Sequence, residues 1–442
     1  MRNLLLPFAL LLALLAVPSV ASAHPERTTF FPDYRKGERP KYRSTGTILT
    51  VCRPESKARI LQAWKGRGPK NSRKRRLRLR QLKRCTFSEI QPAVDAAKNG
   101  SRIRIFPGLY TEETARKVTF NDPKCSLDDP KYWEPTNDGH GENGKVPTYQ
   151  FHWDCKNSRN LIQVMGDSPD DPDRECDQKC NLQFEGLGKK PGDVLVRADR
   201  VKRDAFRADR ADGVVIKNLT FEQGSFNGLD VVETNGFLIE DVIGRYNQNY
   251  GILTFTSDNG LYNRIEAYGN GDSGIYPGSG PEGHCQRYGI EIANSKSYGN
   301  TLGQSGTAGN GTWVHDSEWY DNGTGIVNDS FASGHPGMPQ DCSKWERNKV
   351  YSNNNNFFDE GNQEFCAATP FEKRPREHVC PQFQSPVGVG IAMYGVNNNI
   401  YRDNQIWDNW RSGYRQFWVP AAVRGDNDPD HQFDTSNGVL AQ

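Results

Sequence analysis

A repeated alternation of apolar and polar positions runs through the second half of the chain. Four segments superpose, and each opens on Gly, alternates through a short run and closes on Asn or Asp. They are Gly213–Asn218, Gly236–Asp241, Gly289–Asn294 and Gly311–Asp316, with Gly260–Ile265 as a looser fifth copy. A period of two, filled with Val, Ile, Phe and Thr, predicts short half-buried β-strands rather than helices.

Two further motifs complete each repeat. The first usually consists of an aromatic residue followed two positions later by Asn, and this Asn lies ten or eleven residues past the Gly. Three or four residues after the Asn, another Gly begins the next strand. In successive turns the first motif ends at Gln223, Asn247, Asn270, Asn300, Asn322, Asn353 and Asn409. Their spacing gives a base turn of 22 to 24 residues, with insertions in three turns. One turn cannot bury its apolar side alone, so stacked turns must share a core, along which the Asn side chains can form a hydrogen-bonded ladder.

The motifs GNGDSGIYPGS from Gly269, GIEIANS from Gly289 and the repeated Y-x-N-x-x-x-G-I resemble the repeats of the pectin-lyase-like superfamily. The segment Phe87–Glu113 looks like the N-terminal cap of such proteins, with a short amphipathic helix, a stop at Gly100 and then a strand. The resemblance implies an all-β, right-handed parallel β-helix, a solenoid of 22–24-residue turns with a short N-terminal capping helix. It implies no single chemistry, because this superfamily hosts many.

The stretch Gly269–Gly274 also spells G-x-G-x-x-G, the fingerprint of a dinucleotide-binding turn. Asn270 and Gly274, however, occupy the places that Asn247 and Gly251 hold in the preceding turn. A dinucleotide site needs a strand, a tight turn and a helix in succession, and this context is missing here. We therefore interpret these glycines as one corner of the solenoid and expect no nucleotide partner.

The first 23 residues have the features of a secretory signal peptide. Arg2 is followed by a long apolar run, and Ala21-Ser22-Ala23 forms an A-x-A cleavage site. No later stretch is apolar enough to span a bilayer. We expect a secreted protein, extracellular or periplasmic, without a membrane span.

Ten cysteines suit disulfides in an oxidising compartment. We predict pairing in chain order, although connectivity does not follow from sequence alone. The pairs would be Cys52–Cys85, Cys125–Cys155, Cys176–Cys180, Cys285–Cys342 and Cys366–Cys380. A zinc site is the alternative for Cys176 and Cys180, but no second close Cys or His pair accompanies them.

The net charge of +2 is unevenly distributed. Lys65–Arg84 holds eleven basic residues and no acidic one, which leaves the rest of the chain at 2 − 11 = −9. Such a block is either a solvated linker, or a propeptide removed after export, or a contact for an anionic cell-surface polymer.

The same patterns divide the chain into parts. We expect a signal peptide at 1–23, an irregular basic segment at 24–85 and a β-helix domain at 86–424. That domain would contain a cysteine-bearing insertion at 121–180 and a regular stack at 211–424. The polar tail 425–442 carries Asp426-x-Asp428-x-Asp430 but lacks the Gly and Glu of a calcium loop.

Function in a solenoid usually resides in the insertions. Those at 277–287, 331–342 and 366–386 should form walls beside one outer face, and Asp230 and Tyr276, each two residues past a strand's Gly, should line one ladder on it. The candidate catalytic residues are His284, Tyr276, Asp329 and His335. The candidate substrate-binding residues are Asp230, Glu282, Arg287 and Arg376. No metal ligand is assigned, and the cofactor is left open, with calcium as one candidate.

Such a groove suits two reactions on polysaccharides. In β-elimination, a His, Arg or Tyr base removes the proton next to a uronate carboxyl group, and cations stabilise the resulting charge. In hydrolysis, two carboxylates flank the glycosidic bond. The sequence shows no catalytic motif of a known pectate lyase, polygalacturonase or mannuronan epimerase.

The sequence thus predicts an exported protein that acts on or binds polysaccharide, foremost as a carbohydrate-active enzyme of lyase, hydrolase or epimerase type. The alternative is a non-catalytic glycan-binding, surface-binding or accessory exported protein. Substrate and oligomeric state stay open.

Overall fold

The computed structural model describes residues 27–66, 68–119, 123–135, 143–331, 335–382, 384–419 and 439–441. The predicted signal peptide and nearly all of the predicted tail lie outside these ranges.

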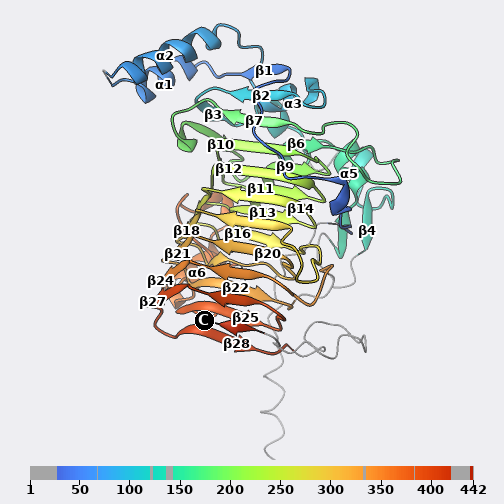
Figure 1. Ribbon diagram of the computed structural model, residues 1–442. Coiled ribbons are helices and arrows are strands. Elements are labelled where there is room, and N and C mark those ends of the chain that lie inside the picture. Colours follow the sequence, from blue (N-terminus) through green and yellow to red (C-terminus); the bar gives the residue numbers. More distant parts are fainter. Residues whose placement is uncertain are drawn as a thin grey trace, which may run out of the picture.

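Parallel strands are stacked in three columns along one axis (Figure 1). The first stack contains β1 (Ile48–Val51), β2 (Arg102–Ile105), β7 (Gln183–Gly186), β10 (Val214–Glu222), β12 (Asn235–Arg245), β14 (Asp258–Asn263), β17 (Ile290–Ala293), β20 (Thr312–His315), β23 (Lys344–Glu346), β26 (Ile400–Arg402) and β29 (Leu440–Ala441). The second contains β3 (Gly108–Tyr110), β8 (Val194–Arg197), the later halves of β10 and β12, β15 (Glu266–Tyr268), β18 (Lys296–Tyr298), β21 (Glu318–Tyr320), β24 (Lys349–Tyr351) and β27 (Gln405–Trp407).

The third stack contains β6 (Asn160–Met165), β9 (Asp204–Asp209), β11 (Asn227–Val232), β13 (Ile252–Phe255), β16 (Ser273–Gly278), β19 (Leu302–Gln304), β22 (Thr324–Asp329), β25 (Val389–Tyr394) and β28 (Ser412–Phe417). Alternate residues of all three stacks meet in one long apolar core. The predicted right-handed parallel β-helix is confirmed; its hand is the one that nearly all connections between parallel strands adopt.

The corners explain the repeated Gly and Asn. Asn218, Asp241, Asn294 and Asp316, the residues that close the four superposed segments, have φ between 50° and 58°, a region that Asn and Asp tolerate better than other residues with side chains. The predicted Asn ladder is also present, with each side-chain amide donating to the next Asn oxygen at 2.8–3.1 Å. It runs through Asn247, Asn270, Asn300, Asn322, Asn353 and Asn409. Asn270 therefore joins neighbouring turns, as expected for a solenoid corner.

Several helices lie at the N-terminal end (Figure 1). Helix α3 (Ile90–Ala96) packs against β1, β2 and β6. Strand β1 extends the first stack with residues that precede the predicted domain start. The basic segment, expected to be irregular, instead forms α1 (Ser56–Ala63) and α2 (Pro69–Leu82). Pro69 at the first turn and straight-chain Lys, Arg, Gln and Leu favour this helix despite their like charges.

The remaining helices and the antiparallel strand pair lie outside the three stacks. Helix α4 (Glu113–Arg116), the antiparallel pair β4 (Trp133–Pro135) and β5 (Lys145–Pro147), and helix α5 (Tyr149–Asp154) precede β6, and α6 (Glu360–Ala368) lies between β24 and β25. All five disulfides join cysteines in the predicted chain order. Such bonds persist in oxidising compartments, which favours export. Within the described residues, no helix combines the length and apolar character needed to cross a membrane.

Candidate functional site

The outer face of the third stack lies between the three long insertions. Residues 277–287 and 331–342 both connect a third-stack strand to a first-stack strand, so they leave the same corner, as predicted. The Cys285–Cys342 disulfide joins these two insertions. Residues 366–386 connect the second stack to the third and therefore flank the opposite side of this face.

One ladder of side chains runs along this outer face. Asp230 pairs with Leu253, which pairs with Tyr276, as the sequence predicted. The same position, two residues past each strand's Gly, continues through the later turns. We call the set the outer ladder, and it consists of Asp230, Leu253, Tyr276, Ser305, Val327, Ala392 and Arg415.

The N-terminal end of the outer ladder is closed by ion pairs. Arg207, the neighbour of Asp230 on β9, donates to Asp230 at 2.6 Å and to Asp209 at 2.9 Å. Arg27 contacts Asp209 and Glu233 at 2.5 and 2.9 Å. All five side chains are buried. Burial raises the pKa of Asp230 to about 7, against the opposing effect of Arg207. Asp230 thus serves a buried ion-pair network here and is not open to a polymer.

The middle of the outer ladder gathers three of the four candidate catalytic residues. The Tyr276 hydroxyl lies 3.4 Å from Nε2 of His335, whose ring packs edge-on against Phe255 at 5.4 Å. Asp329 accepts a hydrogen bond from the Thr307 hydroxyl at 2.8 Å. Tyr276, Asp329 and His335 are only 2–6% exposed. The insertion that carries His335 therefore folds over the sheet, where the sequence suggested an open groove.

The electrostatics of this cluster favour protonated groups. Burial raises the pKa of Tyr276, and the neighbouring charge of Asp329 adds to the rise, so the phenol keeps its proton at neutral pH. Burial likewise raises the pKa of Asp329. Burial raises the pKa of Asp272 to about 7, and the charge of Asp329 contributes. Asp272, at the start of β16, was not among the predicted site residues.

The other predicted residues lie elsewhere. His284 is 73% exposed and pairs with Glu282 at 3.3 Å, away from the buried cluster. Arg287 is held by Asp258 at 2.7 Å, and its guanidinium carbon lies 3.8 Å from the Tyr34 ring centroid. Arg376 lies beside Glu377 and above the Tyr246 ring. Each of these side chains contacts residues close to it in the fold. None of the contacts brings it to Tyr276.

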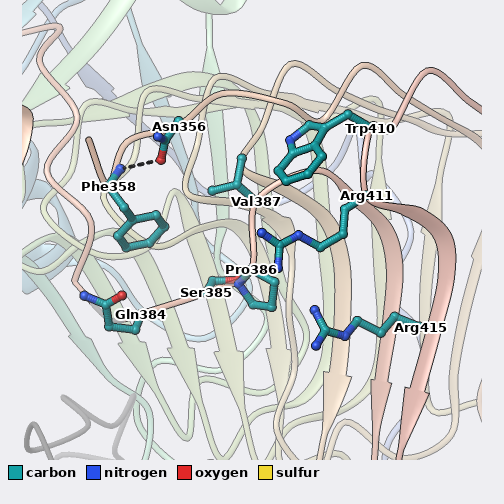
Figure 2. A pocket seen from close by; sticks show the side chains of 9 residues that line it. All are labelled: Asn356, Phe358, Gln384, Ser385, Pro386, Val387, Trp410, Arg411 and Arg415. Atoms are coloured by element: carbon teal, nitrogen blue, oxygen red, sulfur yellow. Dashed lines mark hydrogen bonds between the residues drawn. The ribbon is translucent and has the colours of Figure 1, made fainter. Parts of the chain in front are cut away.

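An open pocket lies at the C-terminal end of the same face (Figure 2). Its volume is about 630 Å³, within the range of pockets that bind small ligands. Nine residues line it, and none is acidic: Asn356, Phe358, Gln384, Ser385, Pro386, Val387, Trp410, Arg411 and Arg415. The indole of Trp410 is 64% exposed, and the Arg411 guanidinium lies 4.8 Å from it. Within the described residues, neither Arg411 nor Arg415 makes an ion pair with a carboxylate.

The solenoid fixes the geometry of this pocket. Trp410 follows Asn409, the last rung of the Asn ladder, and its backbone N–H donates to the Asn354 side chain at 2.9 Å. Its indole lies on Gly388, where an added Cβ would come within 2.3 Å of the ring nitrogen. Arg415 ends the outer ladder, paired with Ala392. The Trp and the two Arg side chains therefore stand on a rigid corner and strand.

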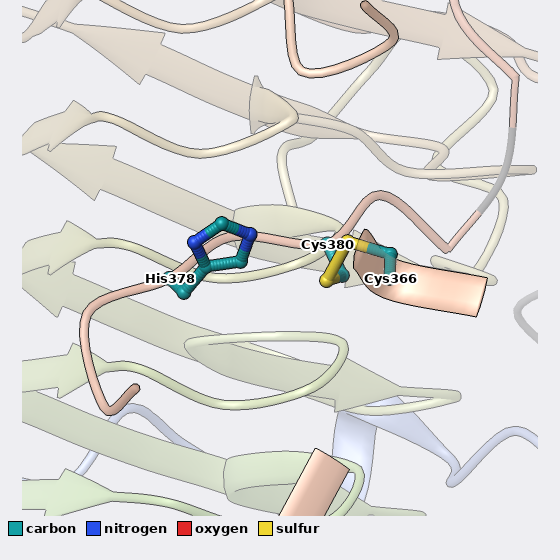
Figure 3. Close-up of side chains that lie close together, drawn as sticks. All are labelled: Cys366, His378 and Cys380. Atoms are coloured by element: carbon teal, nitrogen blue, oxygen red, sulfur yellow. A yellow bond between two sulfur atoms is a disulfide. The ribbon is translucent and has the colours of Figure 1, made fainter. Parts of the chain in front are cut away.

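Two clusters combine cysteines with other metal-binding residue types. Cys366, His378 and Cys380 lie together (Figure 3), and so do Cys285, Asp341 and Cys342. In both, the two cysteines form a disulfide. A sulfur in a disulfide offers no thiolate, which is the form that binds metal. The two disulfides therefore hold the insertions in place.

No family model and no curated protein matches the chain. Among solved structures it is similar to pectate lyase Pel9A, with 15% identity over 84% of this chain and 73% of that chain, at a TM-score of 0.35. The periplasmic alginate epimerase AlgG matches at 11% identity over 78% of this chain and 61% of that chain, with a TM-score of 0.33. An alginate lyase from Paenibacillus sp. str. FPU-7 matches at 12% over 74% and 94%, with a TM-score of 0.26. At such values the activities of those proteins carry no argument about this one.

Sequence reasoning missed Trp410, Arg411 and Arg415. A signal for Arg415 existed, because it stands two residues past Gly413, as Tyr276 stands two past Gly274. A signal for the other two existed as well. Trp410 and Arg411 follow an Asn-ladder corner, where earlier turns have small or polar residues such as Gly271 and Thr301.

Proposed function

We propose that the protein is exported and binds acidic polysaccharide in the pocket beside Trp410. The observation that carries this proposal is the combination of an exposed indole with two arginines that have no acidic residue in the pocket lining. Two positive charges that make no ion pair within the described part of the chain make the pocket attractive to an anionic ligand.

The residue types match the chemistry of a uronate chain. The flat apolar face of an indole buries a large area against the C–H face of a sugar ring. A guanidinium offers two parallel N–H donors to a carboxylate, which gives both charge and orientation. Of the outer-ladder residues, Arg415 lines this pocket, so a bound carboxylate would meet the ladder at its C-terminal end.

Helix α2 supports a second contact with an anionic polymer. None of its residues is buried, and it projects at the end of the molecule opposite β28 (Figure 1). Its charge attracts a long polyanion through salt-sensitive forces that do not need a shaped pocket. The two positive surfaces therefore suit a polymer rather than a single small sugar.

The proposal is tested by calorimetric titration of the mature protein with uronate oligosaccharides and neutral oligosaccharides of matched length. We expect binding of the uronate series and a loss of about tenfold, near 1.4 kcal/mol, on Trp410→Ala. Trp407→Ala is the matched control, since Trp407 is also exposed but stacks on Tyr351 outside the pocket. Equal binding of neutral and acidic sugars, or equal losses in both variants, would contradict the proposal.

A second candidate function is acid–base catalysis on the bound polysaccharide. The observation that favours it is the grouping of Asp329 and His335 around Tyr276, which lies on the same ladder as Arg415. Tyr276 lies four strands from Arg415, about 19 Å at the spacing of β-strands. His335 would accept the proton next to a uronate carboxyl group, and the protonated Tyr276 would donate to the leaving oxygen. The residues that cover the cluster, among them His335 itself, must give the substrate access, because the cluster is buried.

Turnover assays separate the two functions. The protein is incubated with acidic polysaccharides, with and without Ca²⁺, while unsaturated-uronate absorbance and new reducing ends are followed. Catalysis predicts product with the wild type and none with Tyr276→Phe, while both bind equally. Binding without product across the panel eliminates lyase and hydrolase activity and leaves the binding function standing.

A further inference from the structure

The loop that connects β6 to β7 is unusually acidic. Residues 167–177, DSPDDPDRECD, contain six carboxylates, and the Cys176–Cys180 disulfide closes the end of the loop. The loop leaves the same corner of the solenoid as the insertions 277–287 and 331–342, but at the N-terminal end of the stack. It lies outside the pocket and the outer ladder.

Three of these carboxylates converge. One carboxylate oxygen each of Asp167, Asp171 and Asp177 lies within 4.8 Å of the other two. Oxygens bound to one Ca²⁺ stand about 2.3–2.6 Å from the ion, so oxygens on opposite sides are about 4.6–5.2 Å apart. The observed separation therefore fits three ligands of a single ion.

Asp167 provides an independent indication of a missing ligand. Its side chain is fully buried, and Oδ2 accepts a hydrogen bond from Arg210 at 2.9 Å. Its other oxygen, Oδ1, has no hydrogen-bond partner among the described residues. Buried carboxylate oxygens normally have a partner, because an unsatisfied one loses its hydration without replacement. A cation at the centre of the cluster would supply that partner.

The rest of the cluster is held in place. The backbone N–H and the hydroxyl of Ser168 donate to Asp177 at 3.1 and 2.7 Å. The Tyr149 hydroxyl donates to the backbone oxygen of Asp167 at 2.8 Å. Three carboxylates of like charge are thus held close together.

We propose that Asp167, Asp171 and Asp177 form a binding site for Ca²⁺. The ligands are all hard oxygens, and three carboxylates against one Arg leave negative charge for a divalent ion. Ca²⁺ accepts flexible carboxylate geometry with added water, whereas Mg²⁺ demands a near-octahedral shell at shorter distances. Through Arg210 the site is linked to Glu233 and so to Arg27, which means that the ion would stabilise the corner on which the N-terminal segment docks.

The experiment uses the full mature protein, freed of metal with a chelator. Calorimetry follows Ca²⁺ binding, and tyrosine-sensitised Tb³⁺ luminescence reports on the distance to Tyr149. We expect Asp171→Asn or Asp177→Asn to weaken Ca²⁺ binding at this site by at least about tenfold, or 1.4 kcal/mol. Asp170→Asn removes the same charge from an exposed neighbour that is not in the cluster, and it should change the affinity by less than about twofold.

Tyr149→Phe removes the phenol beside the site and also its hydrogen bond to the backbone oxygen of Asp167. It should therefore lower the sensitised Tb³⁺ emission strongly and the calorimetric Ca²⁺ affinity more weakly than Asp171→Asn does. Absence of Ca²⁺ binding in the wild type would overturn the proposal. Equal weakening by Asp170→Asn and Asp171→Asn would overturn it as well, since it would show general attraction by loop charge. Far-ultraviolet circular dichroism of each variant establishes that the solenoid is intact.

Discussion

Two arginines on the same face of the third stack have opposite surroundings. Arg207 lies beside Asp209 and Asp230 and is buried, whereas Arg415 has Ala392 as its ladder neighbour and lines an open pocket. The backbone around them is the same repeat. Neighbouring acids and covering segments, rather than position in the solenoid, therefore decide whether an arginine is buried in ion pairs or left in an open pocket.

The largest expected effect is at the closed end. Arg207→Met leaves Asp209 and Asp230 buried with less compensation, and removing one partner of a buried pair costs about 3–5 kcal/mol. Arg415→Met should change the free energy of unfolding by less than about 0.5 kcal/mol, because no buried charge loses its partner. Chemical denaturation followed by circular dichroism measures both. Similar losses of unfolding free energy in the two variants would show that Arg207 and Arg415 do not differ in their contribution to stability.

A second prediction concerns how the free energy of unfolding depends on pH, because the buried carboxyl group of Asp272 should contribute to this dependence. Its pKa is about 7 in the folded chain and 3.8 in the unfolded chain, so the folded state holds a proton that the unfolded state has lost between these values. Its contribution therefore stabilises the fold most at low pH and declines as pH rises, by about 3 kcal/mol from pH 4 to pH 7. Asp272→Asn should flatten this decline and raise stability at pH 7. An unchanged pH profile in the variant would exclude Asp272 as its source.

A third substitution, with a smaller expected effect, would give the open pocket a carboxylate, like those that surround Arg207. Gln384→Glu places a carboxylate in the lining of the pocket that also contains the two arginines, while keeping the shape of the side chain. We expect about threefold weaker binding of uronate oligosaccharides, near 0.7 kcal/mol, at low salt, and a smaller effect as salt screens the charge. Neutral oligosaccharides serve as the control. Stronger uronate binding in the variant would place the ligand elsewhere.

Much of the fold could be predicted because the same physics repeats in every turn. Positions such as Asn270 and Gly274 recur with a fixed period, and the structure places them in the Asn ladder and at a strand start. Helix α2 was missed because its charges suggested a solvated coil. Leu79 and Leu82, which pack against the cluster around Trp64, help to hold it.

The site was harder to predict because it depends on features that occur once. The structure brings Tyr276, Asp329 and His335 together but leaves His284, the fourth candidate, apart, and the catalytic role of all four stays a prediction. The sequence did not indicate the burial of the three, which follows from the packing of His335 over Phe255. Applied to the last turn, the position two residues past each strand's Gly would have identified Arg415 and, with it, the pocket. No periodicity, however, indicates where a corner such as Trp410 is left uncovered.

The central claim is that the charges of the open pocket select an acidic polysaccharide. The most direct measurement is a calorimetric comparison of a uronate oligosaccharide with its carboxyl-reduced, neutral counterpart, on the wild type and on Arg415→Gln. We expect the wild type to prefer the acidic form by at least about tenfold. Arg415→Gln should lose most of this preference while its affinity for the neutral form is unchanged. An undiminished preference in Arg415→Gln would show that the pocket charges do not select the ligand.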